Sequence, residues 1–156
     1  MEIERKFLVP AVPDPLAQLD ASEIRQGYLA VDADAEVRVR RRGTATTLTV
    51  KRGAGQTRDE VELAIDPGDF ERLWPLTAGR RVEKTRHRIA ADGGLTIELD
   101  VYSGALAGLV VAEVEFADER QAGAFAAPAW FGREVTDDPR FKNQALARDG
   151  APDGAR

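Results

Sequence analysis

Carboxylates and cations alternate with apolar residues along several stretches of this 156-residue sequence. Glu2 and Glu4 flank Ile3 near the N-terminus, and Arg38 and Arg40 flank Val39. Side chains two residues apart share one face of a β-strand, so each stretch would carry a charged face and an apolar face. Carboxylates on such a face could bind hard divalent cations, and Lys and Arg side chains could bind phosphate oxygens.

Sorting the strand residues by parity gives a charged face on which the signs are segregated by strand. The acidic pairs are Glu2/Glu4, Glu60/Glu62, Glu98/Asp100 and Glu113/Glu115, and the basic residues are Lys6, Arg38, Arg40, Lys51, Lys84 and Arg86. A solvated face is the usual interpretation of such strands, but it normally mixes neutral polar residues with its charges. If the sheet closed with this face inward, the interior would be a wet tunnel for a polyanion, because an unpaired buried charge costs several kcal/mol.

The spacing of apolar residues predicts eight strands. They are expected at 2–9, 24–31, 37–40, 46–51, 58–64, 81–90, 95–102 and 109–116. Short turn signals between them favour antiparallel neighbours. Helices are expected after Asp66-Pro67 and after Asp118, with shorter ones at 15–19 and 143–147. We therefore predict an α+β, mainly β fold: an eight-stranded antiparallel barrel forming a charged tunnel with a few flanking helices. The expected domain is 1–148, and 149–156 is expected to be a disordered tail.

The composition excludes several classes of protein and site. With 22 Lys and Arg against 27 Asp and Glu, the formal net charge is −5, so no nucleic-acid partner is expected. The chain has no Cys and only one His, so a metal site would have to use oxygen ligands, which suit Mg²⁺ or Mn²⁺. No apolar run approaches the roughly 18 residues of a membrane span, so we expect no membrane association and a cytoplasmic location.

The charged motifs also follow one another in a characteristic order. They are Glu2-x-Glu4-x-Lys6, Gln26-Gly27-Tyr28-Leu29, Val37-Arg38-Val39-Arg40, Leu48-Thr49-Val50-Lys51, Glu60-x-Glu62, Glu83-Lys84-x-Arg86, Glu98-x-Asp100, Glu113-x-Glu115 and Gly132-Arg133-Glu134-Val135-Thr136. This ordered set, from residue 2 to about 147, resembles the CYTH domain family, the triphosphate tunnel metalloenzymes. The resemblance implies a tunnel-forming barrel that acts on triphosphate compounds with a divalent metal.

The resemblance also implies a role for each charged group. The implied metal ligands are Glu2, Glu4, Glu113, Glu115 and Asp100; the implied phosphate-binding cations are Lys6, Arg38, Arg40, Lys51, Lys84 and Arg86. Glu98 and Asp100, together with Lys84 and Arg86, are the expected catalytic residues. Four further residues have two interpretations each. Glu60 and Glu62 either bind a metal or orient the cations, Tyr28 either contacts the substrate or fills the barrel, and Arg133 either forms a surface ion pair or lies at the tunnel mouth.

The function implied is metal-dependent hydrolysis of a triphosphate, first of all inorganic tripolyphosphate, by direct attack of water. The alternatives are an adenylate cyclase of class IV type, a thiamine or nucleoside triphosphatase, and a polyphosphate-binding module without turnover. The expected partner is a small-molecule triphosphate. The sequence leaves open which triphosphate is used, whether Mg²⁺ or Mn²⁺ serves, whether one or two metals bind, and the oligomeric state.

Overall fold

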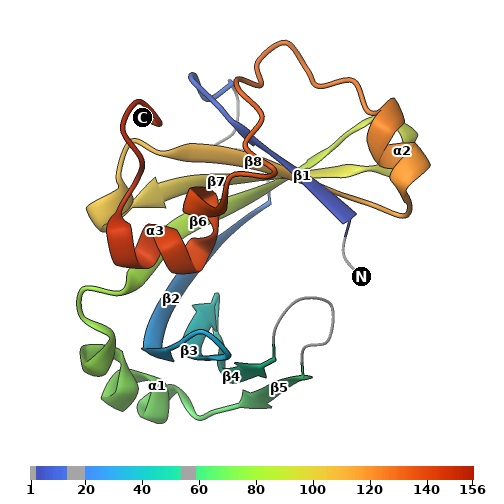
Figure 1. Cartoon of the computed structure of the whole chain (residues 1–156). Coiled ribbons are helices and arrows are strands. Elements are labelled where there is room, and N and C mark those ends of the chain that lie inside the picture. Colours follow the sequence, from blue (N-terminus) through green and yellow to red (C-terminus); the bar gives the residue numbers. More distant parts are fainter. Residues whose placement is uncertain (1–2, 14–19, 54–58) are drawn as a thin grey trace.

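A computed structural model describes residues 3–13, 20–53 and 59–156 (Figure 1). Eight strands form one sheet: β1 (Ile3–Leu8), β2 (Ala21–Val31), β3 (Ala35–Arg42), β4 (Ala45–Arg52), β5 (Asp59–Ala64), β6 (Arg81–Ala90), β7 (Thr96–Ser103) and β8 (Val110–Phe116). Every neighbouring pair is antiparallel, in the order β1-β8-β7-β6-β2-β3-β4-β5. The predicted fold class is confirmed, whereas Glu2 and the helix expected at 15–19 lie outside the described residues.

The helices are short and begin where the capping residues predict. In α1 (Pro67–Leu73) the Asp66 side chain accepts a hydrogen bond from the Gly68 amide, and in α2 (Glu119–Ala124) Asp118 accepts one from the Gln121 amide. The remaining helical elements are α3 (Asn143–Asp149) and the 3₁₀ turns η2 (Trp74–Thr77), η3 (Asp92–Gly94), η4 (Gly104–Leu106) and η5 (Pro139–Phe141). Across the described part of the chain, no helix is long and apolar enough to cross a membrane.

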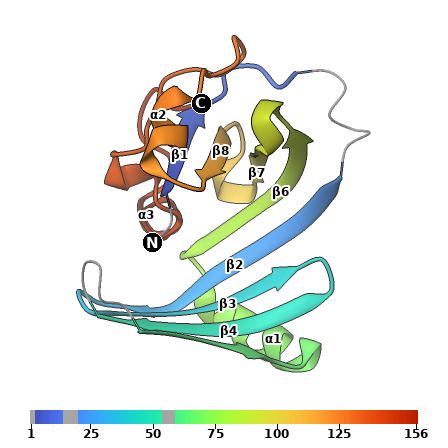
Figure 2. The same ribbon diagram turned by 90° about the vertical axis from the view of Figure 1, so that its right-hand side faces the viewer.

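The apolar face of the sheet lies on the outside of its curve, where α1 and α2 cover parts of it. Figure 2 shows α1 beneath β3 and β4, on the outside of the curved sheet. Phe70 of α1 is fully buried there, and Arg41 on the same face pairs with Glu71 of α1. At the other end of the sheet, the rings of Phe7 and Phe116 pack against Phe125, which follows α2. The two predicted helices therefore cover apolar strand faces.

This covering stops short of β5. Val61 and Leu63 on the outer face of β5 are each 53% exposed, and Val50 of the neighbouring strand is 37% exposed. All six residues of β5 are exposed. The flanking helices thus cover the apolar faces of β1, β3 and β8, and they leave those of β4 and β5 partly exposed.

The predicted eight-stranded sheet curves as expected, but within the described residues it does not close into a hydrogen-bonded ring. The free edge of β1 is occupied by residues 132–136, which we call the edge segment. The Leu8 amide donates to the Arg133 carbonyl at 2.9 Å, and the Val135 amide donates to the Lys6 carbonyl at 2.8 Å. Because these backbone groups of β1 are already satisfied, they are not available to β5.

One end of the concave face is filled by apolar residues and by the C-terminal part of the chain. Leu146 and Ala147 of α3 belong to the same buried cluster as Tyr28 and Tyr102. Ala155, in the segment expected to form a disordered tail, is only 8% exposed and belongs to this cluster as well. Residues beyond 148 therefore contribute to the packing of the domain.

Gly27 offers a test of the close packing between β2 and η2. A Cβ atom at Gly27 would lie 2.5 Å from the Cβ of Thr77, which is fully buried. Thr77 also accepts a hydrogen bond from Arg81, so it cannot move freely. We expect Gly27→Ala to lower the free energy of unfolding by about 1–3 kcal/mol, as overpacking does. Urea denaturation measures this, with Gly123→Ala as control, because Gly123 lies in α2 with no atom within 4 Å of an added Cβ.

Candidate active site

Strand register places the predicted charged residues on one face of the sheet. Lys6 lies opposite Glu113, which in turn lies opposite Glu98, and Arg86 lies opposite Asp100. Extended across all strands, this face contains Glu4, Lys6, Glu36, Arg38, Arg40, Arg42, Lys51, Glu60, Glu62, Lys84, Arg86, Arg88, Glu98, Asp100, Glu113 and Glu115. We call it the charged face. It is the concave one, because α1 and α2 lie on the opposite, outer side (Figure 2).

Asp100 of β7 forms the centre of a buried ionic cluster. Its Oδ2 accepts a hydrogen bond from Lys84 Nζ at 2.7 Å, and its Oδ1 and Oδ2 accept from Arg86 Nε at 2.8 Å and Nη2 at 3.0 Å. Asp100 is 1% exposed and Lys84 is 4% exposed. The Arg86 guanidinium also contacts Glu98 at 2.9 Å and Glu113 at 3.7 Å. One arginine therefore connects three carboxylates from β7 and β8.

Burial and these neighbours shift the pKa values of the cluster in a consistent way. Burial alone would raise the pKa of Asp100, but Lys84 and Arg86 outweigh it and lower that pKa. Burial would lower the pKa of Arg86, but Asp100, Glu98 and Glu113 together raise it. For Lys84, burial and the nearby Arg86 charge outweigh the attraction of Asp100 and lower its pKa. Asp100 and Arg86 are thus held ionised, whereas the pKa of Lys84 lies below its ordinary value.

Three glutamates of β1 and β8 lie on the charged face beside this cluster. Glu4 is directly opposite Glu115, both are exposed, and Glu113 is the next residue of the charged face on β8. Carboxylate oxygens without His or Cys are the donors that Mg²⁺ and Mn²⁺ prefer, so these residues fit such an ion. Among the described residues, no three carboxylates are already gathered as a metal-binding cluster. The metal roles of Glu4, Glu113 and Glu115 remain predictions, as does that of Glu2.

Asp100 has a second predicted role, as a metal ligand. In this structure both of its oxygens accept hydrogen bonds from Lys84 or Arg86. The arrangement supports a role in holding the two cations, whereas metal binding by Asp100 would require some of these bonds to be replaced.

Arginines of β3 provide the other half of the charged face. The Nε atoms of Arg38 and Arg40 are buried and have no hydrogen-bond partner among the described residues. Burial, followed by the charges of Arg86 and Arg38, lowers the pKa of Arg40. Arg38 has one nearby carboxylate, Glu36, at 3.7 Å. Buried donors in a field of excess positive charge are suited to an anion.

The residues with two interpretations occupy distinct surroundings. Tyr28 is 2% exposed, accepts a hydrogen bond from Gln26, and packs in the cluster that includes α3. Glu60 lies 3.9 Å from Lys51, and Glu62 accepts a hydrogen bond from Thr49 at 3.4 Å. These contacts favour a barrel-filling role for Tyr28 and a cation-orienting role for Glu60. Glu62 contacts a threonine, and its charge raises the pKa of Arg40 against the larger lowering by burial.

Arg133, the fourth of these residues, is exposed on the edge segment. Its backbone carbonyl, rather than its side chain, makes the hydrogen bond to β1. The structure therefore does not bring the Arg133 side chain together with the charged face through any described hydrogen bond or ion pair.

Two members of this face, Glu36 and Arg42, lie outside the predicted strand 37–40. Arg42 continues the alternation of Arg38 and Arg40, and its charge acts on Arg40. Glu36 begins the same alternation on β3 and lies opposite Lys51. Parity would have found both residues had the strand been extended to its observed ends, Ala35 and Arg42.

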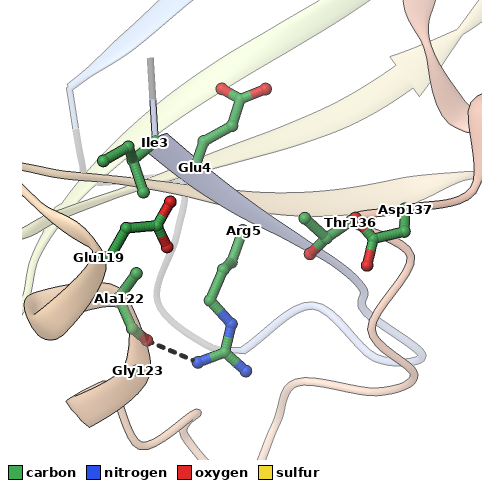
Figure 3. Close-up of a pocket in the computed structure, with 8 residues that line it drawn as sticks. All are labelled: Ile3, Glu4, Arg5, Glu119, Ala122, Gly123, Thr136 and Asp137. Atoms are coloured by element: carbon green, nitrogen blue, oxygen red, sulfur yellow. Dashed lines mark hydrogen bonds between the residues drawn. The ribbon is translucent and has the colours of Figure 1, made fainter. Parts of the chain in front are cut away.

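A pocket of about 610 Å³ lies beside the acidic end of this face (Figure 3). Glu4, Arg5, Glu119, Thr136 and Asp137 are among the residues that line it. Figure 3 shows the side chains of Glu4 and Arg5 leaving β1 in opposite directions. The pocket therefore reaches from the charged face around the edge of the sheet to its outer side.

A curved antiparallel sheet with ionised, partly desolvated side chains on its concave face defines a protein that binds a small polyanion. The CYTH domain model matches residues 1–144, so the chain belongs to the CYTH family. An inorganic triphosphatase of Nitrosomonas europaea is 51% identical over 147 residues, which cover 94% of this chain and 96% of that protein. An inorganic triphosphatase of Acetivibrio thermocellus is 39% identical over 150 residues, covering 94% and 93%.

Solved structures agree with this assignment. A crystal structure of an inorganic triphosphatase matches with a TM-score of 0.82 and 49% identity, covering 95% of each chain. A protein from Hippeastrum, described as a putative adenylyl cyclase with a dominant triphosphatase activity, matches with a TM-score of 0.57, covering 79% of this chain and 83% of that one. At 16% identity the second match establishes only a shared fold.

Replacing Asp100, the central carboxylate of the ionic cluster, should destabilise the folded protein. Asp100→Asn leaves Lys84 and Arg86 buried without their main counter-charge, so we expect the free energy of unfolding to fall by about 3–5 kcal/mol. Asp149→Asn breaks an exposed pair with Arg148 that solvent screens, so its effect on the free energy of unfolding should be much smaller. Urea denaturation of both variants at neutral pH makes the comparison.

The same variant changes the dependence of stability on pH. Because Asp100 has a lowered pKa in the folded protein, its contribution is complete above about pH 3.9, the ordinary aspartate value. The contribution is lost as the pH falls through the lower, folded value. Asp100→Asn should therefore reduce the slope of unfolding free energy against pH in this acid range, and an unchanged slope would contradict the pairing.

Proposed function

We propose that this protein is a metal-dependent inorganic triphosphatase, which hydrolyses tripolyphosphate to orthophosphate and pyrophosphate. The observation that carries the proposal is the shared face of the Asp100 cluster, the Glu4 and Glu115 carboxylates, and the Arg38 and Arg40 guanidinium groups. The 51% identity to the Nitrosomonas europaea enzyme supports the same substrate. A cytoplasmic location is part of this proposal.

Glu4, Glu113 and Glu115 are the described residues that would hold a divalent ion. Family membership makes the enzyme metal-dependent, and the oxygen donors favour Mg²⁺ or Mn²⁺. Such an ion supplies neutralisation of phosphate charge and makes water a better nucleophile. Glu98 contacts Arg86 and lies opposite Glu113, so it connects the carboxylates with the cations of β6.

The cations of the charged face bind the phosphate chain and stabilise its charge. Arg38 and Arg40 offer buried N–H donors from β3, and Lys6 and Lys51 lie on β1 and β4, toward the two edges of the sheet. Phosphoryl transfer needs positioning and charge stabilisation more than covalent chemistry, so cations arranged around the chain serve both needs. Arg86 remains protonated throughout because its three carboxylate neighbours raise its pKa.

Water attacks a terminal phosphoryl group in line with the anhydride oxygen that leaves. Asp100 accepts hydrogen bonds from Lys84 and Arg86 and so holds both side chains in place, and burial lowers the pKa of Lys84 below its ordinary value. No covalent phosphoenzyme is needed. The products are orthophosphate and pyrophosphate, with the water proton passing to a basic group of the site.

Phosphate release from a panel of substrates tests the proposed function. The panel contains tripolyphosphate, pyrophosphate, ATP and thiamine triphosphate, each tested after EDTA treatment and after addition of Mg²⁺ or Mn²⁺. We expect tripolyphosphate to be hydrolysed at least about tenfold faster than the others, and only with metal. Formation of cyclic AMP from ATP would instead support the cyclase alternative, and binding without turnover would support a polyphosphate-binding module.

The Glu4→Gln variant tests the metal site. Loss of one of the exposed carboxylates should reduce activity by at least about 100-fold and shift the metal dependence to higher concentration, with little effect on folding because the side chain is exposed. Activity is measured against Mg²⁺ and Mn²⁺ concentration, and folding by thermal unfolding. A fall in thermal stability with unchanged specific activity would indicate a structural role for Glu4.

Arg40 and Arg41 form a matched pair for the phosphate site. Arg40 lies on the charged face, whereas Arg41 points to the outer face and pairs with Glu71. We expect Arg40→Ala to raise KM for tripolyphosphate and to lower kcat, together by at least tenfold in kcat/KM, because a phosphate contact is lost. Arg41→Ala should remain within about twofold of wild type. Equal, small effects would contradict the assignment of the charged face as the binding face.

A further inference from the structure

The edge segment (residues 132–136) holds β1, which pairs with one strand, β8, among the strands that the structure describes. β1 pairs with β8 on one side, and on its other side the Leu8 amide donates to Arg133 and the Val135 amide to the Lys6 carbonyl. Alternate residues of a strand direct their backbone groups to opposite sides. Lys6 and Leu8 therefore face the edge segment, and Arg5 faces β8.

A polar cluster of three side chains joins β1 to the edge segment. Glu134 accepts hydrogen bonds from Arg5 Nη2 at 2.6 Å and from Arg5 Nε at 3.0 Å. The Thr136 hydroxyl donates to Glu134 Oε2 at 2.6 Å and accepts from the Lys6 amide at 3.0 Å. The Arg5 hydrogen bonds also lower the pKa of Glu134, so this carboxylate stays ionised. We call Arg5, Glu134 and Thr136 the clamp.

The clamp is also attached to α2. Arg5 Nη1 donates to the Ala122 carbonyl at 3.0 Å and to the Phe125 carbonyl at 3.2 Å, the first of which Figure 3 shows. The guanidinium lies over the rings of Phe7 and Phe125. Arg5 therefore connects β1 with two parts of the chain, the end of α2 and the edge segment, that each lie more than 100 residues further along the sequence.

Arg5 lies between Glu4 and Lys6, and its side chain leaves β1 on the opposite side from that of Glu4 (Figure 3). The position and twist of β1 therefore determine where these two charged groups lie. We propose that Arg5, Glu134 and Thr136 are positioning residues that fix β1 so that Glu4 is set for metal binding and Lys6 for phosphate binding. This inference rests on the proposed function for the roles of Glu4 and Lys6, whereas the clamp itself is a contact between described residues.

Thr136 allows a conservative test. Thr136→Val removes the hydroxyl that links Glu134 to the Lys6 amide and keeps the shape of the side chain, whereas Thr136→Ser keeps the hydroxyl. Glu134→Ala removes the carboxylate of an exposed residue. Arg148→Gln is the matched control, because it breaks an exposed Arg–carboxylate pair of 2.8 Å in α3, away from β1.

The first readout is amide hydrogen exchange in the metal-free protein. In Thr136→Val and Glu134→Ala, we expect exchange at the Lys6 and Leu8 amides to become about tenfold faster, while the Arg5 and Phe7 amides, which face β8, stay within about twofold. Thr136→Ser and Arg148→Gln should behave as wild type. Unchanged exchange at Lys6 and Leu8 would overturn the proposal.

The second readout is the Mg²⁺ concentration at half-maximal tripolyphosphate hydrolysis. We expect it to rise about fivefold or more in Thr136→Val and Glu134→Ala, with kcat at saturating Mg²⁺ within about threefold of wild type. A loss of kcat and of thermal stability without a shift in the Mg²⁺ midpoint would indicate a merely structural clamp and overturn the positioning role.

Glu4→Gln separates failure of the clamp from failure of the proposed function. If Glu4→Gln alters the Mg²⁺ dependence and the clamp variants do not, the positioning role is wrong and the proposed function stands. If Glu4→Gln leaves the Mg²⁺ dependence unchanged, the proposed metal site is wrong and the positioning of Glu4 for metal falls with it. The exchange measurement, which needs neither metal nor substrate, still decides whether the clamp holds β1.

Discussion

The ionic cluster around Asp100 is the interaction on which the charged face depends. Two cations, Lys84 and Arg86, are nearly withdrawn from water, and they could not remain there without a carboxylate that accepts hydrogen bonds from both. The cluster also fixes strand register, since a one-residue slip of β7 would move Asp100 to the apolar outer face. Arg86 extends the cluster to Glu98 and Glu113, so β6, β7 and β8 are aligned by charge as well as by backbone hydrogen bonds.

The distribution of charge over the sheet then follows from strand order. Carboxylates dominate β7 and β8, and arginines dominate β3. β1 places one residue of each sign, Glu4 and Lys6, on the charged face, and β6 places Lys84 and Arg86 beside the carboxylates of β7. Burial, and then the positive charges of Arg86 and Arg38, lower the pKa of Arg40, and its buried Nε has no partner among the described residues. An anion placed between the two sides would meet donors that lack partners, while a divalent ion would meet oxygen donors. A triphosphate with its metal has this combination of charges.

Much of this arrangement could be predicted from sequence, because a period of two assigns each residue of a strand to a face. Parity placed Asp100, Lys84, Arg86 and Arg40 together and separated Arg41 from them. Parity does not determine which residues pair across strands, since this depends on turn lengths, so the contacts of Asp100 with two cations were not foreseen. The lack of hydrogen-bonded closure among the described strands was also unpredictable, because it depends on residues 132–136 reaching β1 from a distant part of the chain. The same holds for Ala155, a small residue whose burial depends on the position of α3.

The two edges of the sheet are protected from unwanted pairing in different ways. The edge segment pairs with β1, whereas β5 presents Asp59, Glu60 and Glu62 on a fully exposed strand, and charges on an edge strand oppose association with another strand. The sheet can therefore stay curved without closing through backbone hydrogen bonds. An unclosed sheet suits a concave face of ionised groups, because water can reach the exposed carboxylates of Glu4 and Glu115 while Asp100 and Lys84 remain buried. Protection of the two edges thus allows the described strands to stay unclosed, and the unclosed sheet in turn keeps the carboxylates of Glu4 and Glu115 hydrated.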